Sequence, residues 1–270
     1  MDQTTQRLMS GAAGDIGLPT GFHDDTSLLV HLDAGLSTSY SGSGGTWTNL
    51  VTSGSDLWQG KNATINGLGQ TGFSFGGSAT SAGSNGYFLI SNPQNHEHGF
   101  MTIDHGSTVT NGLGTDFSFF VVIRTTSNMN QQSYHSYIDF PNDINLFTSY
   151  QGKLHLYNPS IGQSTTVLAD NTRMSLGLTS KLVNGVRTIN HYIDGLLDSS
   201  VSANSGSNVN FSPDARYISM GGGSDGTTSG GNEYMNGRLS VVMVYNDAIS
   251  ANNMLQNHRN WQNRYSLADN

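Results

Sequence analysis

Short segments in which apolar residues alternate with polar ones, or run together for a few positions, recur along most of this chain. Residues 117–123 form a nearly continuous apolar run, which indicates a central strand that is buried on both faces. Residues 153–157 alternate instead, with Lys153, His155 and Tyr157 on one side and leucines on the other. Because successive side chains of a strand point to opposite faces, this alternation predicts one wet face and one core face.

Further strands are predicted where apolar stretches are bounded by turn residues. The predicted segments are 28–32, 73–75, 87–90, 144–147, 216–220 and 238–245. Between residues 176 and 201, the pairs Asn184-Gly185 and Asp194-Gly195 each separate two strand-like runs. Such pairs tolerate the positive φ values of type I′ turns, so we expect two successive β-hairpins that form a meander.

The period of the apolar positions changes near the C-terminus. Met254, His258, Trp261 and Tyr265 are spaced four, three and four residues apart, which places them on one face of a helix. Ser250 is a suitable N-cap residue. We therefore expect one short helix over about residues 250–265 that closes an otherwise all-β protein.

Residues 1–27 differ from the rest of the chain. The glycines between residues 11 and 21, together with Pro19, cannot sustain a long helix or a paired strand. We interpret this region as an extended N-terminal arm, which is either ordered by docking on a partner or an unstructured terminus. Residues 28–270 then form one domain, because sandwiches of this length often contain a single core.

Composition narrows the classes of function. The 270 residues include 34 glycines but only 11% charged residues, which suits many short strands joined by Gly-rich turns. The formal net charge is −8 with only 11 Lys and Arg residues, so no basic footprint for nucleic acid is visible. Cysteine is absent, and the core must stabilise the fold without disulfides.

Membrane insertion and export by a standard leader are not expected either. The longest apolar runs are of strand length and too short to span a bilayer. The first ten residues lack the apolar run of a signal peptide.

Four short motifs follow one another along the chain. They are Leu-Asp-Ala-Gly at 32–35, Thr-Trp-Thr-Asn-Leu at 46–50, Tyr-Ile-Asp-Gly at 192–195 and Asn-Asp-Ala-Ile-Ser at 246–250. In this order they resemble the concanavalin A-like lectin/glucanase (laminin-G-like) jelly rolls. The resemblance implies an all-β, antiparallel two-sheet jelly-roll sandwich with a short C-terminal helix and an extended N-terminal arm. Lectins, glycosidases, adhesins and virion parts share this fold, so the function stays open.

Catalysis on this fold would need paired carboxylates. Retaining glycosidases place two of them about 5 Å apart, and the resemblance implies a Glu-x-Asp-x-x-Glu pattern or a near variant on one strand. The chain has two glutamates, Glu97 and Glu233, and neither has an acidic residue two or three positions away. The sequence therefore predicts that the protein is not an enzyme, with a divergent glycoside hydrolase as the least favoured alternative.

His96, His98 and His105 form a histidine cluster with two carboxylates nearby. Two imidazoles at alternate positions of a strand would share one face and, with carboxylates, suit a zinc-like site. The favoured interpretation is a solvated polar loop between the strands at 87–90 and 117–123. Histidines packed at an interface would instead make binding depend on pH.

Asp139, Asn142 and Asp143 form an oxygen-rich cluster beside Pro141. Calcium prefers such hard ligands, but Asp and Asn side chains also build turns, and turn formation is favoured here. The sequence therefore predicts no cofactor, with calcium as the alternative.

Sugar binding needs an exposed aromatic side chain flanked by amides or carboxylates. The candidates for glycan binding are Trp58 and Tyr134, the second within an Asn/Gln-rich loop at 127–136, although packing is favoured for Trp58. Trp47 and Trp261 are expected in the core. The first lies in a segment that the resemblance marks as structural, and the second lies on the apolar face of the helix.

Proteins with this opening, without a leader and with a short Gly/Ala-rich arm, resemble those encoded in tailed-phage structural gene clusters. The resemblance predicts a non-enzymatic virion protein, a capsid decoration or fibre-associated component assembled in the host cytoplasm, whose lectin-like domain faces outward and adheres to host-surface glycans. Its partners would be other virion proteins, contacted through the arm, and further copies of itself. The alternative is a free-standing carbohydrate-binding lectin or adhesin.

Overall fold

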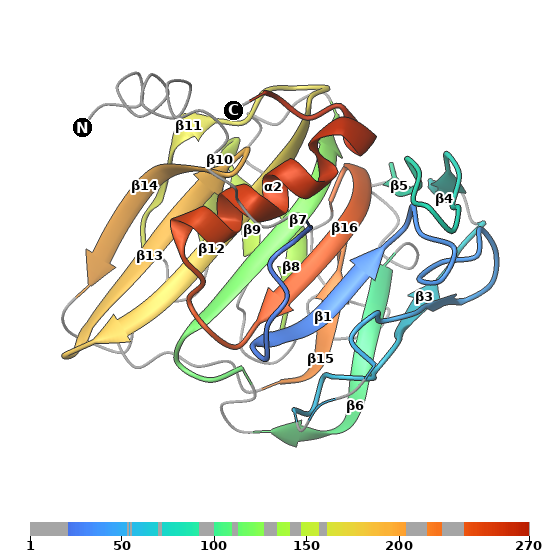
Figure 1. The fold of residues 1–270 in the computed structure, drawn as a ribbon. Helices are drawn as coiled ribbons and strands as arrows, with labels where there is room; N and C mark the ends of the chain where they lie inside the picture. The colour runs from blue at the N-terminus through green and yellow to red at the C-terminus, as the bar shows by residue number, and fades with distance from the viewer. Residues whose placement is uncertain are drawn as a thin grey trace.

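The computed structural model describes residues 21–52, 54, 56–69, 72–91, 100–109, 113–126, 134–140, 147–156, 161–203, 215–222 and 235–269. These residues form two antiparallel β-sheets and one α-helix (Figure 1). The predicted all-β sandwich of two sheets with a short C-terminal helix is thereby confirmed. Residues 1–20, which make up most of the predicted arm, lie outside the described residues.

The first sheet has the strand order β14-β13-β12-β7-β16-β5-β4, and β1 is paired to β16 beside this path. Its strands are β1 (Leu28–Asp33), β4 (Phe73–Gly76), β5 (Tyr87–Ile90), β7 (Phe117–Thr125), β12 (Arg173–Val183), β13 (Val186–Ile193), β14 (Leu196–Ala203) and β16 (Gly237–Tyr245). One edge of β16 pairs with β7, and the other edge is shared by β5 at one end and β1 at the other. The nearly continuous apolar run therefore forms a central strand, as predicted, with both faces buried over most of its length.

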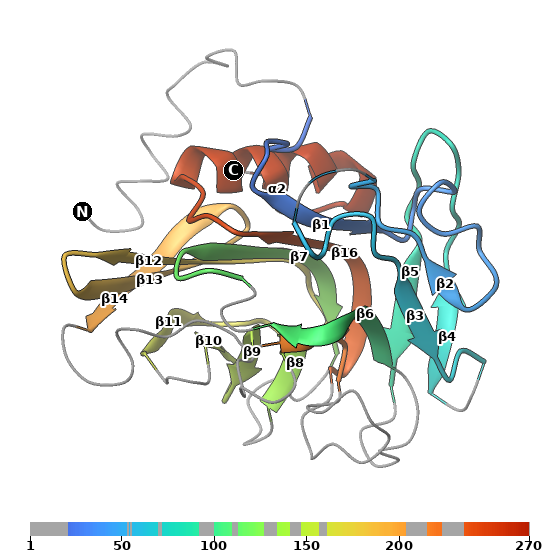
Figure 2. The ribbon, with the colours of Figure 1, turned by 90° about the horizontal axis from the view of Figure 1, so that it is seen from below.

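The second sheet has the strand order β11-β10-β9-β8-β15-β6-β3-β2. Its strands are β2 (Thr46–Trp47), β3 (Ala63–Asn66), β6 (Phe100–Val109), β8 (Tyr134–Asp139), β9 (Phe147–Tyr150), β10 (Lys153–Leu156), β11 (Gln163–Val167) and β15 (Ala215–Met220). It lies against the inner face of the first sheet (Figure 2).

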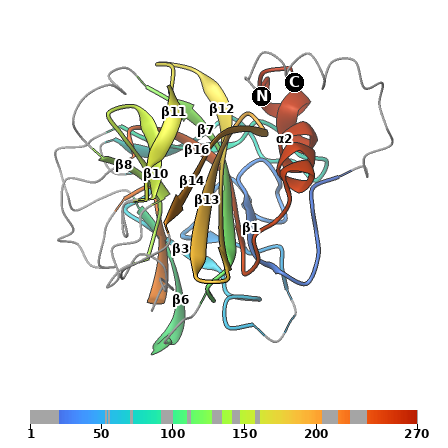
Figure 3. The ribbon, with the colours of Figure 1, turned by 90° about the vertical axis from the view of Figure 1, so that its left-hand side faces the viewer.

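The helix α2 (Ala251–Tyr265) adds a third layer on the outer face of the first sheet (Figures 2 and 3). Two apolar layers result. One lies between the sheets and includes Trp47 and Phe119, and the other lies between the first sheet and α2 and includes Phe120 and Met243. Within the described part of the chain, the helical structure is too short or too polar to span a bilayer.

The predicted start and buried face of the helix are confirmed. The Ser250 hydroxyl accepts a hydrogen bond from Asn253 N at 3.2 Å, which is the N-cap contact. The four residues at helical spacing are all buried beneath α2, namely Met254, His258, Trp261 and Tyr265. Their side chains supply the apolar surface that covers the centre of the first sheet.

The meander of β12, β13 and β14 also forms as predicted. Asn184 and Gly185 have φ values of 51° and 75°, and Asp194 and Gly195 have φ values of 49° and 76°. Two consecutive residues with positive φ are what a type I′ hairpin turn requires.

Two details of the second sheet differ from the sequence prediction. His155 was expected on a wet face but is 5% exposed, because β11 pairs with β10 and also lies against β14 of the first sheet. The segment predicted as a solvated loop between 91 and 116 contains β6, which pairs with β3 and β15. Met101 and Ile103 of β6 point into the core between the sheets.

The end of the predicted arm, residues 21–27, lies against the helical layer. The Tyr245 hydroxyl donates to His23 O at 2.9 Å, and Gln256 Nε2 donates to Gly21 O at 3.1 Å. Phe22 stacks on Trp261 with 5.7 Å between the ring centroids. These contacts attach the segment before β1 to its own domain.

Candidate functional site

Trp58, a predicted glycan-binding residue, is fully buried at 0% exposure and offers no face to a sugar. Its ring packs edge-on against His105 of β6, with 4.7 Å between the ring centroids. Packing, the favoured interpretation of Trp58, is what the structure has. Its polar neighbours shape a turn, in which Asp56 Oδ1 accepts from Trp58 N and Gln59 Oε1 accepts from Asp56 N. The structure thus brings two predicted site residues together as packing partners.

The other predicted site residues lie in β8 or outside the described residues. Asp139 ends β8, is 1% exposed and pairs with Ser219 of β15. The backbone of Tyr134 begins β8 opposite Tyr150, whereas its side chain lies outside the described part. Outside the described residues lie His96, His98, Asn142, Asp143, Glu97 and Glu233. Among the residues that are described, no three His, Cys, Asp or Glu side chains are grouped to hold a metal ion, and most members of the zinc-like and calcium alternatives lie outside this part of the chain.

A cleft of ≈ 410 Å³ lies between α2, β1 and the segment before β1, and we call it the α2–β1 cleft. Trp261 and Arg264 reach it from α2, because residues three apart share one side of a helix. His31 and Asp33 reach it from β1, because alternate residues of a strand share one face. The sequence motif at 32–35 marked this strand, but nothing local in the sequence indicated that the helix would lie over it.

The floor of the cleft is organised around the carboxylate of Asp33, which is fully buried. One oxygen, Oδ1, accepts from Gly35 N at 2.9 Å and from the Tyr265 hydroxyl at 3.3 Å. The other, Oδ2, accepts from Trp261 Nε1 at 3.1 Å and from Arg264 Nη2. With four donors on two oxygens, Asp33 fixes the last turn of α2 against β1 and holds the guanidinium of Arg264 in place.

His31 is the second polar group of the floor and is 3% exposed. Its ring lies edge-on to Phe22 and to Trp261, with centroid distances of 4.4 Å and 5.7 Å. Burial lowers its pKa to about 4, so the imidazole is neutral at pH 7. Its Nε2 atom has no hydrogen-bond partner among the described residues. Leaving a buried polar atom without a partner costs stability, so the aromatic packing around the ring offsets this cost.

The rim of the cleft carries the side chains of Asn260 and Asn263, both exposed, and of Phe22, which is half-buried. Arg264 is 18% exposed and reaches from the floor to the rim. Amides donate and accept hydrogen bonds, and a fixed guanidinium donates several. A cleft with aromatic walls and a few convergent polar groups suits an uncharged, polyhydroxylated ligand.

Comparison with known proteins identifies the class of fold. The chain matches no protein-family model and no curated protein. Among solved structures, Trypanosoma rangeli sialidase in complex with sialic acid matches with a TM-score of 0.55 and 12% identity over 90% of this chain and 34% of the sialidase chain. The binding domain of Paraclostridial Mosquitocidal Protein 1 matches with a TM-score of 0.55 and 14% identity, over 88% of this chain and 53% of that one.

A third solved structure, a mutant of HCR/D, matches with a TM-score of 0.51 and 12% identity over 87% of this chain and 51% of that one. The chain therefore spans between a third and about half of the proteins that it matches. At such identities the likeness shows the fold alone, which is a lectin-like β-sandwich. None of these three structures is of a virion protein.

The prediction that the protein is not an enzyme is wrong. It rested on the lack of paired carboxylates in the sequence, but solved structures with this fold include sialidases, which are enzymes. Both glutamates, Glu97 and Glu233, lie outside the described part of the chain.

Proposed function

We propose that this protein is a carbohydrate-binding domain of the concanavalin A-like type and that it holds a glycan in the α2–β1 cleft. The observation that carries the proposal is the meeting in one cleft of two exposed amides, a fixed guanidinium and aromatic side chains. The similarity to a toxin binding domain and to a sialidase bound to sialic acid supports it, because both proteins share this fold.

The cleft is preorganised for such a ligand. Arg264 is held by the buried carboxylate of Asp33, so its direction is set before a ligand arrives. His31, neutral and buried between Phe22 and Trp261, holds these two aromatic rings in place at the floor. Groups that are already fixed lose little conformational entropy on binding, which favours affinity.

The test is a glycan array probed with the full chain, followed by titration calorimetry on the glycans that bind. Replacing both rim amides, Asn260→Ala with Asn263→Ala, removes hydrogen bonds to the ligand and should weaken binding about tenfold or more. Asn252→Ala is the matched control, because Asn252 is an exposed amide of α2 outside the cleft. Mass spectrometry of each glycan after incubation shows whether it is only bound or also hydrolysed.

Two outcomes would contradict the proposal. One is an array on which no glycan binds, and the other is a double variant whose affinity equals that of the Asn252→Ala control. A loss of binding confined to the double variant, with unchanged circular dichroism, places the ligand in the cleft.

The assignment to a virion, with host-surface glycans as ligands and further copies of the chain as partners, stays a prediction from the sequence. Residues 21–27 are attached to α2 and β16, so a docking arm would have to be formed by residues 1–20. Deleting those residues should leave the fold intact and remove the protein from purified particles. The assignment would be contradicted if the shortened chain were still incorporated into particles. It would also be contradicted if the full-length protein were not found in purified particles.

A further inference from the structure

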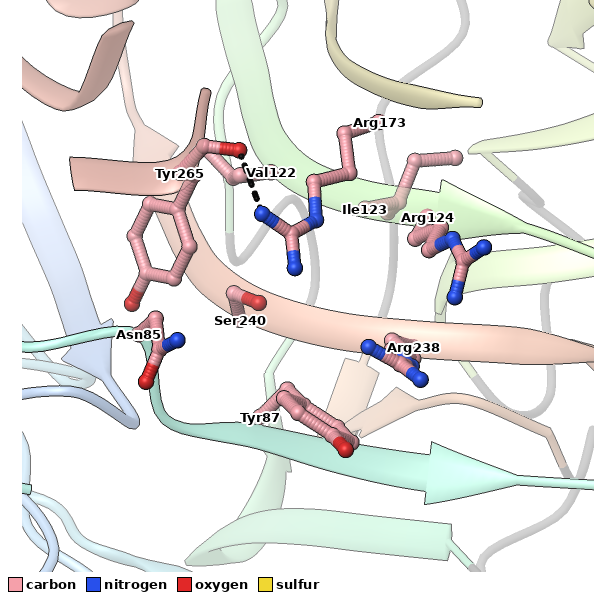
Figure 4. Close-up of a pocket in the computed structure, with 9 residues that line it drawn as sticks. All are labelled: Asn85, Tyr87, Val122, Ile123, Arg124, Arg173, Arg238, Ser240 and Tyr265. Carbon is pink, nitrogen blue, oxygen red and sulfur yellow. Dashed lines mark hydrogen bonds between the residues drawn. The ribbon is translucent and has the colours of Figure 1, made fainter. Parts of the chain in front are cut away.

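Three arginines stand side by side on the outer face of the first sheet, one on each of three neighbouring strands. In the register of the sheet, Arg124 of β7 lies opposite Arg173 of β12 on one side and opposite Arg238 of β16 on the other. All three side chains are half-buried. Figure 4 shows them on one side of the sheet beside Tyr265, at the end of α2. We call these three residues the arginine row.

The arginine row is unfavourable for the folded protein by itself. Like charges directly opposite one another in a sheet are destabilising. The whole chain has only 11 Lys and Arg residues against 19 Asp and Glu residues, yet three of these cations are placed together. The ion pairs formed among the described residues join His23 to Asp25, His258 to Asp194 and Arg264 to Asp33. None of them involves the arginine row, so the described part of the chain leaves its charge uncompensated.

Two of the guanidinium groups are oriented by single hydrogen bonds to backbone carbonyls. Arg173 Nη1 donates to Tyr265 O at 3.2 Å, and Arg124 Nε donates to Asn171 O at 3.4 Å. Each guanidinium carries five N–H groups, so most donors of these two residues have no acceptor among the described residues. The carbonyl of Tyr265 belongs to the last turn of α2, which anchors the row to the helical layer.

The third guanidinium is oriented by an aromatic ring. Arg238 lies over the ring of Tyr87, with 4.2 Å between Cζ and the ring centroid. Stacking of this kind fixes the plane of a guanidinium and leaves the N–H groups at its edge free to bind a ligand. Ser240 adds a hydroxyl to the same depression.

We infer that the arginine row is a binding site for an oxyanion group, a carboxylate or a sulfate, carried by a small anion or by an acidic glycan. Guanidinium groups bind such oxygens by paired, charge-assisted hydrogen bonds. A bound anion would also remove the repulsion between the three neighbouring cations. The residues that line this site and those that line the α2–β1 cleft do not overlap, so this inference goes beyond the proposed function and either can fail alone.

The experiment compares two sources of the same chemical group at constant ionic strength. One arm titrates the full chain with oligogalacturonate, a sugar chain that carries carboxylates, and the other titrates it with sodium sulfate. A neutral oligoglucan of equal length is the control ligand, and any binding of it in the α2–β1 cleft should be the same in the arginine variants as in the wild type. Arg124→Gln and Arg238→Gln keep long polar side chains but remove one cation each, and Lys181→Gln removes an exposed cation from the far end of β12.

We expect each arginine variant to weaken oligogalacturonate binding about tenfold or more, because one charge-assisted contact is lost. The Lys181→Gln control should bind like the wild type, and Asn260→Ala with Asn263→Ala should leave this binding unchanged. Tighter binding of oligogalacturonate than of sulfate identifies an acidic glycan as the ligand, and equal binding identifies a small anion. Equal losses in Lys181→Gln and in the arginine variants, or binding of neither anion, would overturn the inference.

Discussion

The outer face of the first sheet has two parts that are built from the same strands. Beneath α2, Phe120 and Val122 of β7 and Met243 of β16 are at most 1% exposed. Past the last turn of α2, β7 and β16 carry Arg124 and Arg238 of the arginine row. On β7 the buried Val122 and the half-buried Arg124 are successive side chains on the same face of the strand, so the boundary between the two parts lies between them.

The two parts also treat polar groups differently. Under the helix, the buried carboxylate of Asp33 receives four hydrogen bonds and is neutralised by Arg264. In the uncovered part, three cations adjoin one another and no described carboxylate pairs with them. The covered part is therefore arranged for stability, whereas the uncovered part gives up some stability and gains a surface that can bind a ligand.

The largest effect is expected for Trp261→Ala in the covered part. The indole stacks on Phe120 with 5.5 Å between the ring centroids and donates to Asp33. Its removal leaves a cavity and should lower the free energy of unfolding by about 3–5 kcal/mol. Urea unfolding measures the loss. The control is Asn252→Ala, a substitution of an exposed residue, which should stay within about 0.5 kcal/mol of the wild type. A loss below about 1 kcal/mol would mean that α2 contributes little to the covered part.

A second prediction concerns acid sensitivity of the covered part. Burial lowers the pKa of His31 from 6.5 to about 4. The unfolded chain therefore binds a proton that the folded protein does not, and stability falls as the pH decreases from about 6.5 towards 4. At pH 4.5, His31 alone lowers the free energy of unfolding by about 2–3 kcal/mol relative to pH 7. His155 and His191, whose pKa values burial also lowers to about 4, add to the wild-type slope.

The variant His31→Leu isolates the share of His31 from that of the other histidines. It should match the wild type within about 1 kcal/mol at pH 7, since the ring is neutral there. At pH 4.5 it should be about 2 kcal/mol more stable than the wild type. Urea unfolding at both pH values tests this, and parallel loss of stability in the two proteins would contradict it.

A smaller effect is expected at the two ends of the helix that covers the sheet. Ser250→Ala removes the N-cap hydrogen bond to Asn253 N and should cost about 1 kcal/mol. Ser266 at the C-cap has a φ of 52°, which glycine adopts more easily, so Ser266→Gly should stabilise by up to about 1 kcal/mol. Thermal unfolding should show a lower melting temperature for Ser250→Ala and a higher one for Ser266→Gly. Shifts in the same direction for both variants would contradict the prediction.

Local signals explain what the sequence predicted well. The turns at Asn184-Gly185 and Asp194-Gly195 depend on the φ preference of the residues themselves. The helix depends on a cap and on a spacing of apolar residues within fifteen positions. Such features need no knowledge of distant parts of the chain, and the structure confirms them.

Features that depend on distant pairing were missed. The sequence predicts a solvated loop where β6 lies, since the segment is a polar insertion between the strands at 87–90 and 117–123. A local turn does occur within it, where Asp104 Oδ1 accepts from Gly106 N at 2.7 Å. The buried alternation of Met101 and Ile103 was the signal that could have revealed this strand. The arginine row and the α2–β1 cleft gave no such signal, because their residues are brought together only by sheet register and by the docking of α2.

The smallest expected effect lies in the uncovered part, where the removal of one positive charge should raise the free energy of unfolding rather than lower it. Arg124→Gln removes the central cation of the arginine row and gives up only one long hydrogen bond, to Asn171 O at 3.4 Å. In low salt the variant should be more stable than the wild type by a few tenths of a kcal/mol, because repulsion across β7 is relieved. At about 0.5 M NaCl the gain should vanish, since salt screens charges at half-exposed positions.

Thermal unfolding at both salt concentrations measures the difference in stability. Lys181→Gln, outside the arginine row, is the control and should show no gain that salt removes. If Arg124→Gln is less stable than the wild type by the same amount at both salt concentrations, the arginine packs as the covered residues do, and the contrast between the two parts of this face is wrong.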